Sequence, residues 1–492
     1  MMASVEHLAD AVLFPSLGRP TVANWIHQPV AAGLGGFVLF GREATSGDQL
    51  RRLTGELRSL APGTHIAVDE EGGDVSRLEA TGMISTPGNL ALGRIDDLEV
   101  TRECAVQLGL ALRSVGVDWN FAPAVDVAVN PLTPNGVRCF GNDRARVGEH
   151  AAAWVDGLQS TGVSACAKHF PGHGLSGTDA HLGTPDLELS RAELVDAYLD
   201  PFRTVIAAGV DSIMVSHPRV PALDDYPASI SKPVITGLLR DELGYDGVVI
   251  TDALEMQGVA LVADLPRAAV LALQAGADAL CLGSWSFGDD VETCVAAITA
   301  AVASGDLDRK QLERSVERLE QIGSREPTVT GEPDHQLGFR LARQAIEVDG
   351  QPELRGAAVL VVRLEPGISP AAGRGHGDVE GLLESRGLIV ERIAVAGETY
   401  NGEGMVRAGI SEFRSEYGSD GEVIVLVRSP HRYQWQQRLL DEILQTTKDV
   451  IVLDMGLVDR DFSATRAWIR TFGGSSACAT AAADLLRPEQ WR

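Results

Sequence analysis

The chain has 492 residues, of which 45% are hydrophobic and 22% are charged, a composition typical of a soluble globular protein. This length predicts two domains, although one α/β barrel can take about 250 residues by itself. The formal net charge of −26 argues against a nucleic-acid or membrane-surface role, because both of those polyanions repel such a protein.

Eight short apolar runs alternate with helix-like segments over residues 1–323. Such runs are typical of buried parallel strands. Among the segments between them, 265–275 and 290–303 have amphipathic spacing, and a capping box from Ser190 to Glu193 opens a helix toward Ala208. This alternation predicts a (β/α)8 barrel. Its strands are expected at 10–14, 36–40, 65–68, 117–121, 163–167, 212–216, 247–251 and 277–282.

The pattern changes after residue 323. The stretch 324–350 begins with a polar, proline-containing run, which predicts a linker with a helix over 335–346. Four further apolar runs predict a smaller αβα domain over 351–492, with strands at 357–364, 388–394, 422–427 and 450–453. Gly-Gly-Ser after Phe472 indicates a turn and a helix cap more strongly than an anion site.

Six scattered cysteines show no Cys-x-x-Cys spacing, so neither a zinc site nor a disulfide framework is expected, and most should be small buried residues. No uninterrupted apolar run reaches about 18 residues, and the N-terminus has no signal-peptide pattern. We therefore expect no transmembrane helix and a cytoplasmic protein.

Titratable side chains follow four of the expected barrel strands, at Asp69, Lys168, His217 and Asp252. The carboxyl ends of barrel strands carry the active site in this architecture. The loop from Lys168 to His181 is the richest, because it holds three histidines, Asp179 and three glycines, which indicates a mobile catalytic loop. A zinc site is the weaker alternative for this loop, with His169, His173, Asp179 and His181 as its ligands. The spacing of these four residues fits no usual zinc motif, and the neighbouring Lys168 adds a competing positive charge.

The loop also has a specific sequence pattern. Lys168-His-Phe-Pro-Gly-His-Gly174 followed by Thr178-Asp-Ala-His181 resembles the signature of glycoside hydrolase family 3, in its bacterial β-N-acetylglucosaminidase branch. Four other segments support the resemblance in the same order, so that it covers residues 1 to about 320; they are 68–77, 121–126, 135–141 and 247–256. The C-terminal part resembles the sandwich domain of two-domain members in layout and around Phe472.

The resemblance implies a role for each matching residue. It implies a retaining exo-β-N-acetylglucosaminidase with Asp252 as nucleophile, His181 as general acid/base and Asp179 as the partner that orients the imidazole. It further implies no metal or organic cofactor and a small amino-sugar glycoside as the only partner, with the oligomeric state left open. The first sugar would be held by Asp69, Arg77, Arg138, Lys168 and His169. His217 is a further, less secure sugar ligand, with bracing of the site as its alternative role, and Asp126 and His173 are similar bracing candidates.

The chemistry of these side chains agrees with that assignment. A retaining glycosidase usually employs two carboxyl groups, one as nucleophile and one as acid/base. Histidine titrates near neutrality, so His181 can give a proton to the leaving oxygen and later accept one from water. Asp179 can set its tautomer, as the aspartate of a catalytic triad does. Lys168 and Arg138 nearby would favour the ionised form of Asp252.

Three departures from the family pattern stand at Asp74, Cys139 and Leu175. They leave the proposed chemical groups in place, but the loop and Asp74 are expected to affect the leaving-group side of the substrate. Two enzyme alternatives stay open: a phosphorylase, in which phosphate resolves the intermediate, and, less favoured by the Asp-His pair, a β-glucosidase or β-xylosidase. A catalytically silent sugar-binding protein is the alternative of a different class. The natural substrate, a fragment of muropeptide or of chitin, also stays open.

Overall fold

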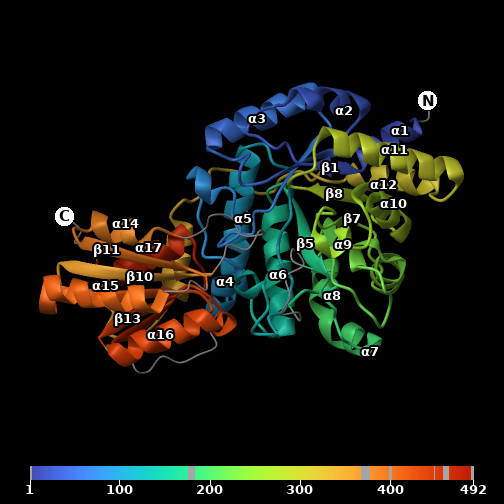
Figure 1. Ribbon diagram of the computed structural model, residues 1–492. Coiled ribbons are helices and arrows are strands. Elements are labelled where there is room, and N and C mark those ends of the chain that lie inside the picture. Colours follow the sequence, from blue (N-terminus) through green and yellow to red (C-terminus); the bar gives the residue numbers. More distant parts are fainter. Residues whose placement is uncertain are drawn as a thin grey trace.

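The computed structural model describes residues 3–174, 183–366, 377–397, 402–447, 449–457 and 465–488. Within them the chain forms two parts that lie side by side, a barrel and a smaller sandwich around its own sheet (Figure 1). This confirms the α/β class and the barrel-plus-sandwich architecture expected from the sequence.

Eight parallel strands form the first sheet, in the order β1-β8-β7-β6-β5-β4-β3-β2. A parallel bridge between Ser16 and Val38 joins β1 to β2 and closes the barrel. Every expected strand is present, but β4 is only two residues long. The strands are β1 (Leu13–Pro15), β2 (Gly36–Leu39), β3 (His65–Val68), β4 (Trp119–Asn120), β5 (Ser164–Phe170), β6 (Ser212–Val215), β7 (Val248–Thr251) and β8 (Ala279–Gly283).

Helical segments follow the strands and cover the barrel, and many begin at a capping side chain. The capping box expected at Ser190 and Glu193 is present, and the helix that it opens runs through an irregular segment, η4 (Leu194–Tyr198), before α8. The main covering segments are α1 (Val5–Ala11), α2 (His27–Ala32), α3 (Gly47–Leu60), α4 (Asn89–Ile95), α5 (Leu98–Ser114), α6 (Arg144–Gln159), α7 (Arg191–Glu193), α8 (Asp200–Ala207), η6 (Pro233–Glu242), α9 (Gln257–Ala260), α10 (Leu265–Ala275), α11 (Gly288–Ser304) and α12 (Arg309–Leu319).

Aromatic rings fill the interior of the barrel. Trp119 lies edge-on to Phe14 at 5.3 Å and to Phe121 at 5.2 Å between ring centroids, and all three are at most 1% exposed. The indole N–H of Trp119 donates to Ser212 Oγ at 2.7 Å, which satisfies its one polar atom. The interior is therefore a packed core rather than a channel, and a ligand must bind at an end of the barrel.

The second sheet has the order β11-β10-β12-β13-β14-β9, with only β9 antiparallel. Its strands carry apolar residues on both faces: Val359 and Val361 face one helical layer, and Leu360 and Val362 face the other. The strands are β9 (Glu347–Gly350), β10 (Ala358–Glu365), β11 (Ile389–Ala396), β12 (Gly421–Val427), β13 (Val450–Asp454) and β14 (Ala467–Arg470); the helices are α14 (Val379–Ser385), α15 (Gly402–Tyr417), α16 (Gln434–Thr446) and α17 (Ser476–Leu486).

The segment 324–350, expected to be a linker, contains α13 (Leu337–Ala345) and then β9. Because β9 pairs with β14, residues 347–350 belong to the second sheet, and the connecting segment is shorter than expected. All six cysteines are buried and none is in a disulfide. In the part of the chain that the structure describes, no helix is long and apolar enough to cross a membrane.

The Gly-Gly-Ser segment before α17 forms the expected turn and cap, and its amides also bind carboxylates of the barrel. Ser475 caps the helix by accepting from the Cys478 amide at 3.2 Å. The Gly474 amide donates to Asp74 Oδ1 at 2.8 Å, and the Ser476 amide donates to Glu79 Oε1 at 3.0 Å. The positive end of the helix is therefore neutralised by the barrel itself.

The other oxygen of Asp74 forms an ion pair with Arg428, which follows β12 in the second part. Burial lowers the pKa of this arginine to about 10. The sequence predicted that Asp74 affects the leaving-group side of the substrate; in the structure both of its oxygens contact the second part of the chain. Asp74 therefore joins the turn after β3 to the C-terminal sheet.

We expect Asp74→Ala to lower the free energy of unfolding by about 3 kcal/mol, because it removes the buried carboxylate that pairs with Arg428 and accepts from the Gly474 amide. Chemical unfolding followed by fluorescence measures this change. Asp484→Ala is the control, since it removes the more exposed pair with Arg343 and should cost less than about 1 kcal/mol. Equal effects of the two substitutions would contradict the assignment of Asp74 as a structural contact between the two parts.

Candidate active site at the carboxyl ends of the barrel strands

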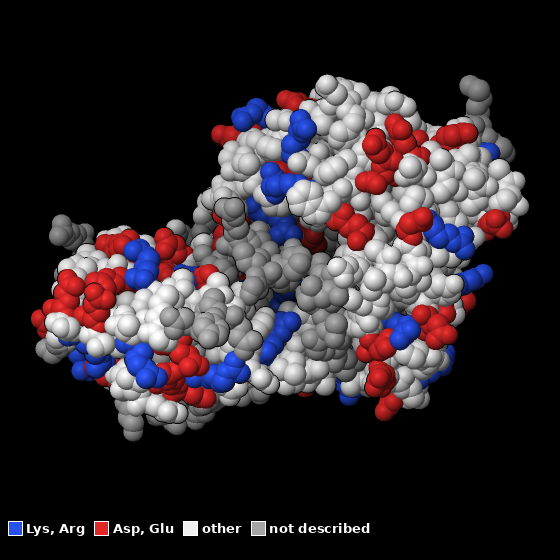
Figure 2. Space-filling model, viewed as in Figure 1, with Lys and Arg blue, Asp and Glu red and all other residues white. Residues whose placement is uncertain are grey.

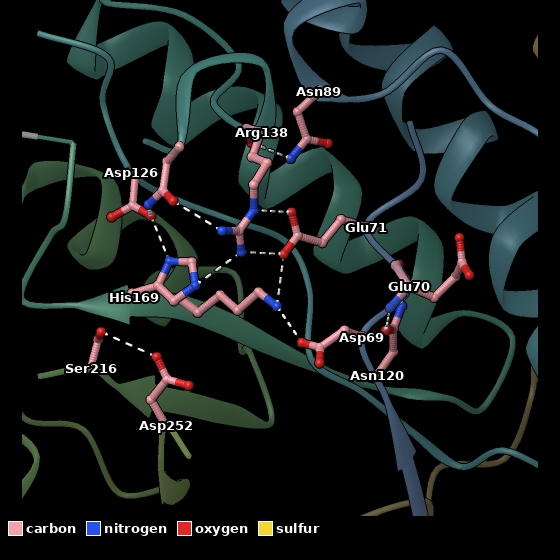
Figure 3. Close-up of polar contacts among 12 residues, drawn as sticks. Asp69, Glu70, Glu71, Asn89, Asn120, Asp126, Arg138, His169, Ser216 and Asp252 are labelled. Atoms are coloured by element: carbon pink, nitrogen blue, oxygen red, sulfur yellow. Dashed lines mark hydrogen bonds and ion pairs between the residues drawn. The ribbon is translucent and has the colours of Figure 1, made fainter. Parts of the chain in front are cut away.

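A network of ion pairs lies where β3 and β5 end (Figure 3). Lys168 Nζ lies 2.6 Å from Asp69 Oδ1 and 2.7 Å from Glu71 Oε1, and the side chains of Lys168 and Glu71 are each only 2% exposed. Burial by itself would lower the pKa of the lysine, but the two carboxylates outweigh burial and raise it. Lys168 therefore remains a cation, with Asp69, 20% exposed, as the more accessible of its two partners.

Glu71 also binds Arg138, which ends the short helical turn η3 (Gly136–Arg138). Arg138 donates to both oxygens of Glu71, from Nε at 2.9 Å and from Nη2 at 2.7 Å. Burial favours the protonated form of Glu71, but Arg138 and then Lys168 outweigh it and hold the pKa of this carboxyl well below its usual value. Glu71 is therefore the shared anion of two buried cations.

The imidazole of His169 has one defined tautomer. Arg138 Nη2, which can only donate, lies 3.1 Å from His169 Nε2, so this nitrogen accepts. His169 Nδ1 lies 2.6 Å from Asp126 Oδ2 and therefore carries the proton. The same oxygen of Asp126 accepts from Asn135 Nδ2 at 2.8 Å. The ring is thus fixed between an arginine and a carboxylate.

Asp252 follows β7 directly. Its Oδ2 accepts from Ser216 Oγ at 3.2 Å, and its Oδ1 accepts from the Ala253 amide at 2.8 Å. Both hydrogen bonds favour the ionised carboxylate, which is the form that a nucleophile needs. Burial, and then the carboxylates of Asp252 and Asp69, raise the pKa of the Cys281 thiol in β8 well above its usual value, which indicates that both carboxylates lie close to this strand.

His217 is fully buried, and both of its ring nitrogens contact protein atoms. Nε2 donates to the Ala253 carbonyl at 2.9 Å, and Nδ1 accepts from Ser229 Oγ at 2.8 Å. These contacts suit a residue that holds the backbone next to Asp252. They suit direct contact with a sugar less well. The sequence left open whether His217 binds the sugar or braces the site, and the geometry favours a residue that braces the site.

The turn that carries Arg77 is held by Glu70. Glu70 Oε2 accepts from the Arg77 amide at 2.7 Å, the Leu78 amide at 2.8 Å and Ser76 Oγ at 3.0 Å. Burial raises the pKa of Glu70 to about 7. Its side chain has no exposed surface, so Glu70 shapes the turn and does not reach a ligand. Arg77 Nη2 lies 3.9 Å from Asp69 Oδ2, which brings these two predicted sugar ligands together.

Two predicted catalytic residues, His181 and Asp179, lie outside the described residues, as does Leu175. His173 is described, and its amide donates to Asp126 Oδ1 at 2.6 Å.

The zinc alternative requires four side chains, of which the structure describes only His169 and His173. The imidazole of His169 already contacts Arg138 and Asp126. Among the described residues no group of three or more His, Cys, Asp or Glu side chains is arranged to hold a metal ion.

The sequence analysis missed Glu71, the anion that joins Lys168 to Arg138. The available signal was its place in the acidic run Asp69-Glu70-Glu71 at the end of β3. Within that run the family resemblance assigns a role only to Asp69, and side chains two residues apart on an extended chain point in the same direction. Glu71 lies two residues beyond Asp69, so both side chains reach Lys168.

Figure 2 shows Lys and Arg atoms in the recess between the barrel and the second part. At the ends of β3 and β5 the cation Lys168 is paired with Asp69 and Glu71, so this end of the barrel carries charges of both signs. A concave, polar centre of this kind at the carboxyl ends of the strands, with the Asp252 carboxylate directly after β7, defines a barrel enzyme with its active site in the usual position.

Comparisons with known proteins identify the family. Residues 18–322 match the family model described as the glycosyl hydrolase family 3 N-terminal domain. A β-hexosaminidase A of Pseudoalteromonas piscicida is 32% identical over 375 residues, covering 68% of this chain and 62% of that relative. A β-hexosaminidase of Hydrogenovibrio crunogenus is 35% identical over 266 residues, covering 53% of this chain and 74% of that relative.

A solved structure of a glycoside hydrolase family 3 β-N-acetylglucosaminidase from a Paenibacillus strain is similar over nearly the whole length. The TM-score is 0.85 at 28% identity, with 99% of this chain and 97% of that chain covered. The chain therefore belongs to glycosyl hydrolase family 3. It is a glycoside hydrolase with the two-part fold of this family.

Proposed function

We propose that this chain is a retaining exo-β-N-acetylglucosaminidase. The observation that carries the proposal is the arrangement of Asp252, bonded by Ser216 and Ala253, at the same barrel end as the Lys168–Asp69–Arg138 network. Relatives named β-hexosaminidase, and a family member with a similar structure named β-N-acetylglucosaminidase, support it. The network supplies the donors and acceptors for the hydroxyl groups of a terminal sugar.

In the proposed mechanism Asp252 attacks the anomeric carbon of the terminal sugar, and the leaving oxygen takes a proton from His181. The resulting ester joins the sugar to Asp252. Water then gives its proton to His181 and attacks the same carbon, so that the sugar leaves with its original β configuration and Asp252 is free again. Asp179 orients the imidazole of His181 in both steps.

The charges of the described carboxylates support a histidine as the acid. A general acid must carry a proton at neutral pH. Glu71 is held ionised by two cations, Asp69 pairs with Lys168, and Glu70 is fully buried behind the turn that it holds. None of these three carboxyl groups suits proton donation to a leaving group, which leaves that role to His181 in our proposal.

Hydrolysis of an aryl β-N-acetylglucosaminide tests the reaction. We expect release of N-acetylglucosamine, with the β-anomer appearing first by proton NMR, at a rate that added phosphate does not change. Formation of N-acetylglucosamine 1-phosphate would instead support the phosphorylase alternative. Faster turnover of the matching β-glucoside would support the glucosidase alternative, and no turnover of any of these would support a silent sugar-binding protein.

We further propose a cytoplasmic role in releasing N-acetylglucosamine from fragments of muropeptide or chitin. Cell fractionation tests the cytoplasmic location, and comparing the turnover of N-acetylglucosaminyl-anhydro-muramic acid with that of chitobiose distinguishes the two sources of substrate.

A further inference from the structure

Trp285 is a large aromatic side chain that the protein leaves in water. It is 71% exposed, whereas Trp119, Trp154 and Trp468 are at most 3% exposed. Burying a tryptophan normally removes much apolar surface from water, so an ordered indole at the surface gives up a considerable stabilisation. Tryptophan is enriched at binding interfaces, because its ring offers a large apolar surface together with a polar N–H group.

The backbone of Trp285 is held in place by Glu255. The Trp285 amide donates to Glu255 Oε2 at 3.0 Å, and Ser284 Oγ donates to Oε1 at 3.1 Å. Gly283 has φ of +114°, and a Cβ there would lie 2.2 Å from the Glu255 carboxyl carbon. The loop after β8 is therefore built around this carboxylate. Glu255 is only three residues beyond Asp252, a separation of at most about 11 Å, so the loop is joined to the loop of the proposed nucleophile.

The ring itself is held by Arg42, which follows β2. The guanidinium carbon of Arg42 lies 4.4 Å from the centroid of the Trp285 ring. Arg42 Nε donates to Glu43 Oε1 at 2.9 Å and Nη2 donates to Ser16 Oγ at 3.1 Å, with the Glu43 side chain fully buried. One face of the indole is thus covered by an anchored side chain. The high exposure of the ring requires that its other face be open.

Trp285 stands at the same end of the barrel as the ion-pair network but nearer to solvent. The loops after β2, β7 and β8 all lie at the carboxyl ends of the strands, and β1 lies between β2 and β8. Within the network Lys168 is 2% and Asp69 20% exposed, so a sugar bound there lies deeper than Trp285. A sugar ring that contacts the indole must therefore be the next ring of the substrate, on the solvent side of that first sugar.

We propose that the open face of Trp285 binds the second sugar ring of the substrate, on the leaving-group side of the bond that Asp252 attacks. A pyranose ring has faces of C–H groups that stack on an aromatic ring, and the fixed indole provides such a surface without ordering a flexible side chain. The inference rests on the proposed function, since it takes a β-linked N-acetylglucosamine disaccharide as the ligand.

The test compares Trp285→Ala and Trp285→Phe on two substrates, N,N′-diacetylchitobiose and β-N-acetylglucosaminyl fluoride. The fluoride has no second ring. We expect Trp285→Ala to lower kcat/KM about tenfold on chitobiose and to change it less than about twofold on the fluoride, since only the disaccharide loses a stacking contact. Trp285→Phe keeps an aromatic face and should lose less. Ile389→Ala, which truncates a residue 52% exposed in β11, is the control expected to change neither rate.

Equal losses on both substrates would overturn the proposal, because they would place Trp285 at the first sugar or in the fold. An unchanged rate on chitobiose would overturn it as well and would leave the indole free for another partner. Turnover of the fluoride by the wild-type protein tests the proposed function separately. If the wild type hydrolyses neither substrate, that function fails and the second-ring site fails with it.

Discussion

Asp252→Asn is expected to lower kcat/KM on an aryl β-N-acetylglucosaminide by at least about 10³-fold, because the amide cannot form the glycosyl ester. The fold should persist. The asparagine oxygen can still accept from the Ala253 amide, which donates at 2.8 Å to Asp252 Oδ1, and the asparagine amide group can donate to Ser216 Oγ in place of the present bond. Steady-state kinetics, with circular dichroism to check the fold, measure both.

Asp241→Asn is the matched control, since it makes the same chemical change at an exposed carboxylate in η6. It should leave the rate within about twofold, as surface substitutions usually do. An active Asp252→Asn protein would remove Asp252 from the role of nucleophile. A further distinction comes from a 2-fluoro sugar with a good leaving group, which should form a stable adduct with the wild type and none with Asp252→Asn.

Glu71→Gln is expected to lower the free energy of unfolding at pH 7 by about 3–5 kcal/mol, because it leaves two buried cations with too little negative charge. Of its two carboxylate partners Lys168 would keep Asp69, and Arg138 would keep at most one of the two oxygens that it now contacts, without the negative charge. The rate should also fall, since the positions of Lys168 and Arg138 depend on this carboxylate. Chemical unfolding and steady-state kinetics on the same preparations measure the two effects.

The pH dependence of this substitution has a defined sign. The pKa of Glu71 is lower in the folded protein than its ordinary value of 4.5, so folding stabilises the ionised form. Its contribution to stability is fully present above the unfolded pKa and is lost as the pH falls toward the folded pKa. The difference in unfolding free energy between wild type and Glu71→Gln should therefore shrink below about pH 4.5.

Glu99→Gln is the control for this prediction, because Glu99 is 78% exposed and lies 3.8 Å from Arg102 on the surface of α5. It should change the free energy of unfolding by less than about 1 kcal/mol at any pH. If Glu71→Gln behaves in the same way, or if its effect grows as the pH falls, Glu71 is not the ionised counter-ion that the geometry indicates.

Most of the barrel was predictable from local sequence. A strand buried between helices and the barrel interior must be apolar throughout, so 212–216 and 247–251 stand out as runs that match β6 and β7 almost residue for residue. The short β4 was less regular, and its apolar run extends beyond the two residues that pair as a strand. The second sheet followed the same rule, except for β9. Its pattern of Glu347, Val348, Asp349 and Gly350 is polar because it is an exposed edge strand.

The candidate site was predictable only in part. Asp69, Lys168 and His169 stand in short contiguous motifs, and a motif can be read without knowing what surrounds it in space. The partners of these residues lie far away along the chain. Glu71 and Arg138 are 67 residues apart, and Asp126 and His169 are 43 apart. Such pairs are brought together by the order of the strands around the barrel, which no local pattern encodes.

By itself the sequence determined the class of fold, the family resemblance and the residue types available for catalysis, because hydrophobic period and contiguous motifs are local properties. The tertiary structure alone decided which charges meet. It gave Glu71 two cations and set the tautomer of His169. It also joined Asp74 to an amide 400 residues later in the chain. The physical reason is that a charge in a packed interior is stable only beside its partner, and closure of the barrel determines which residue that partner is.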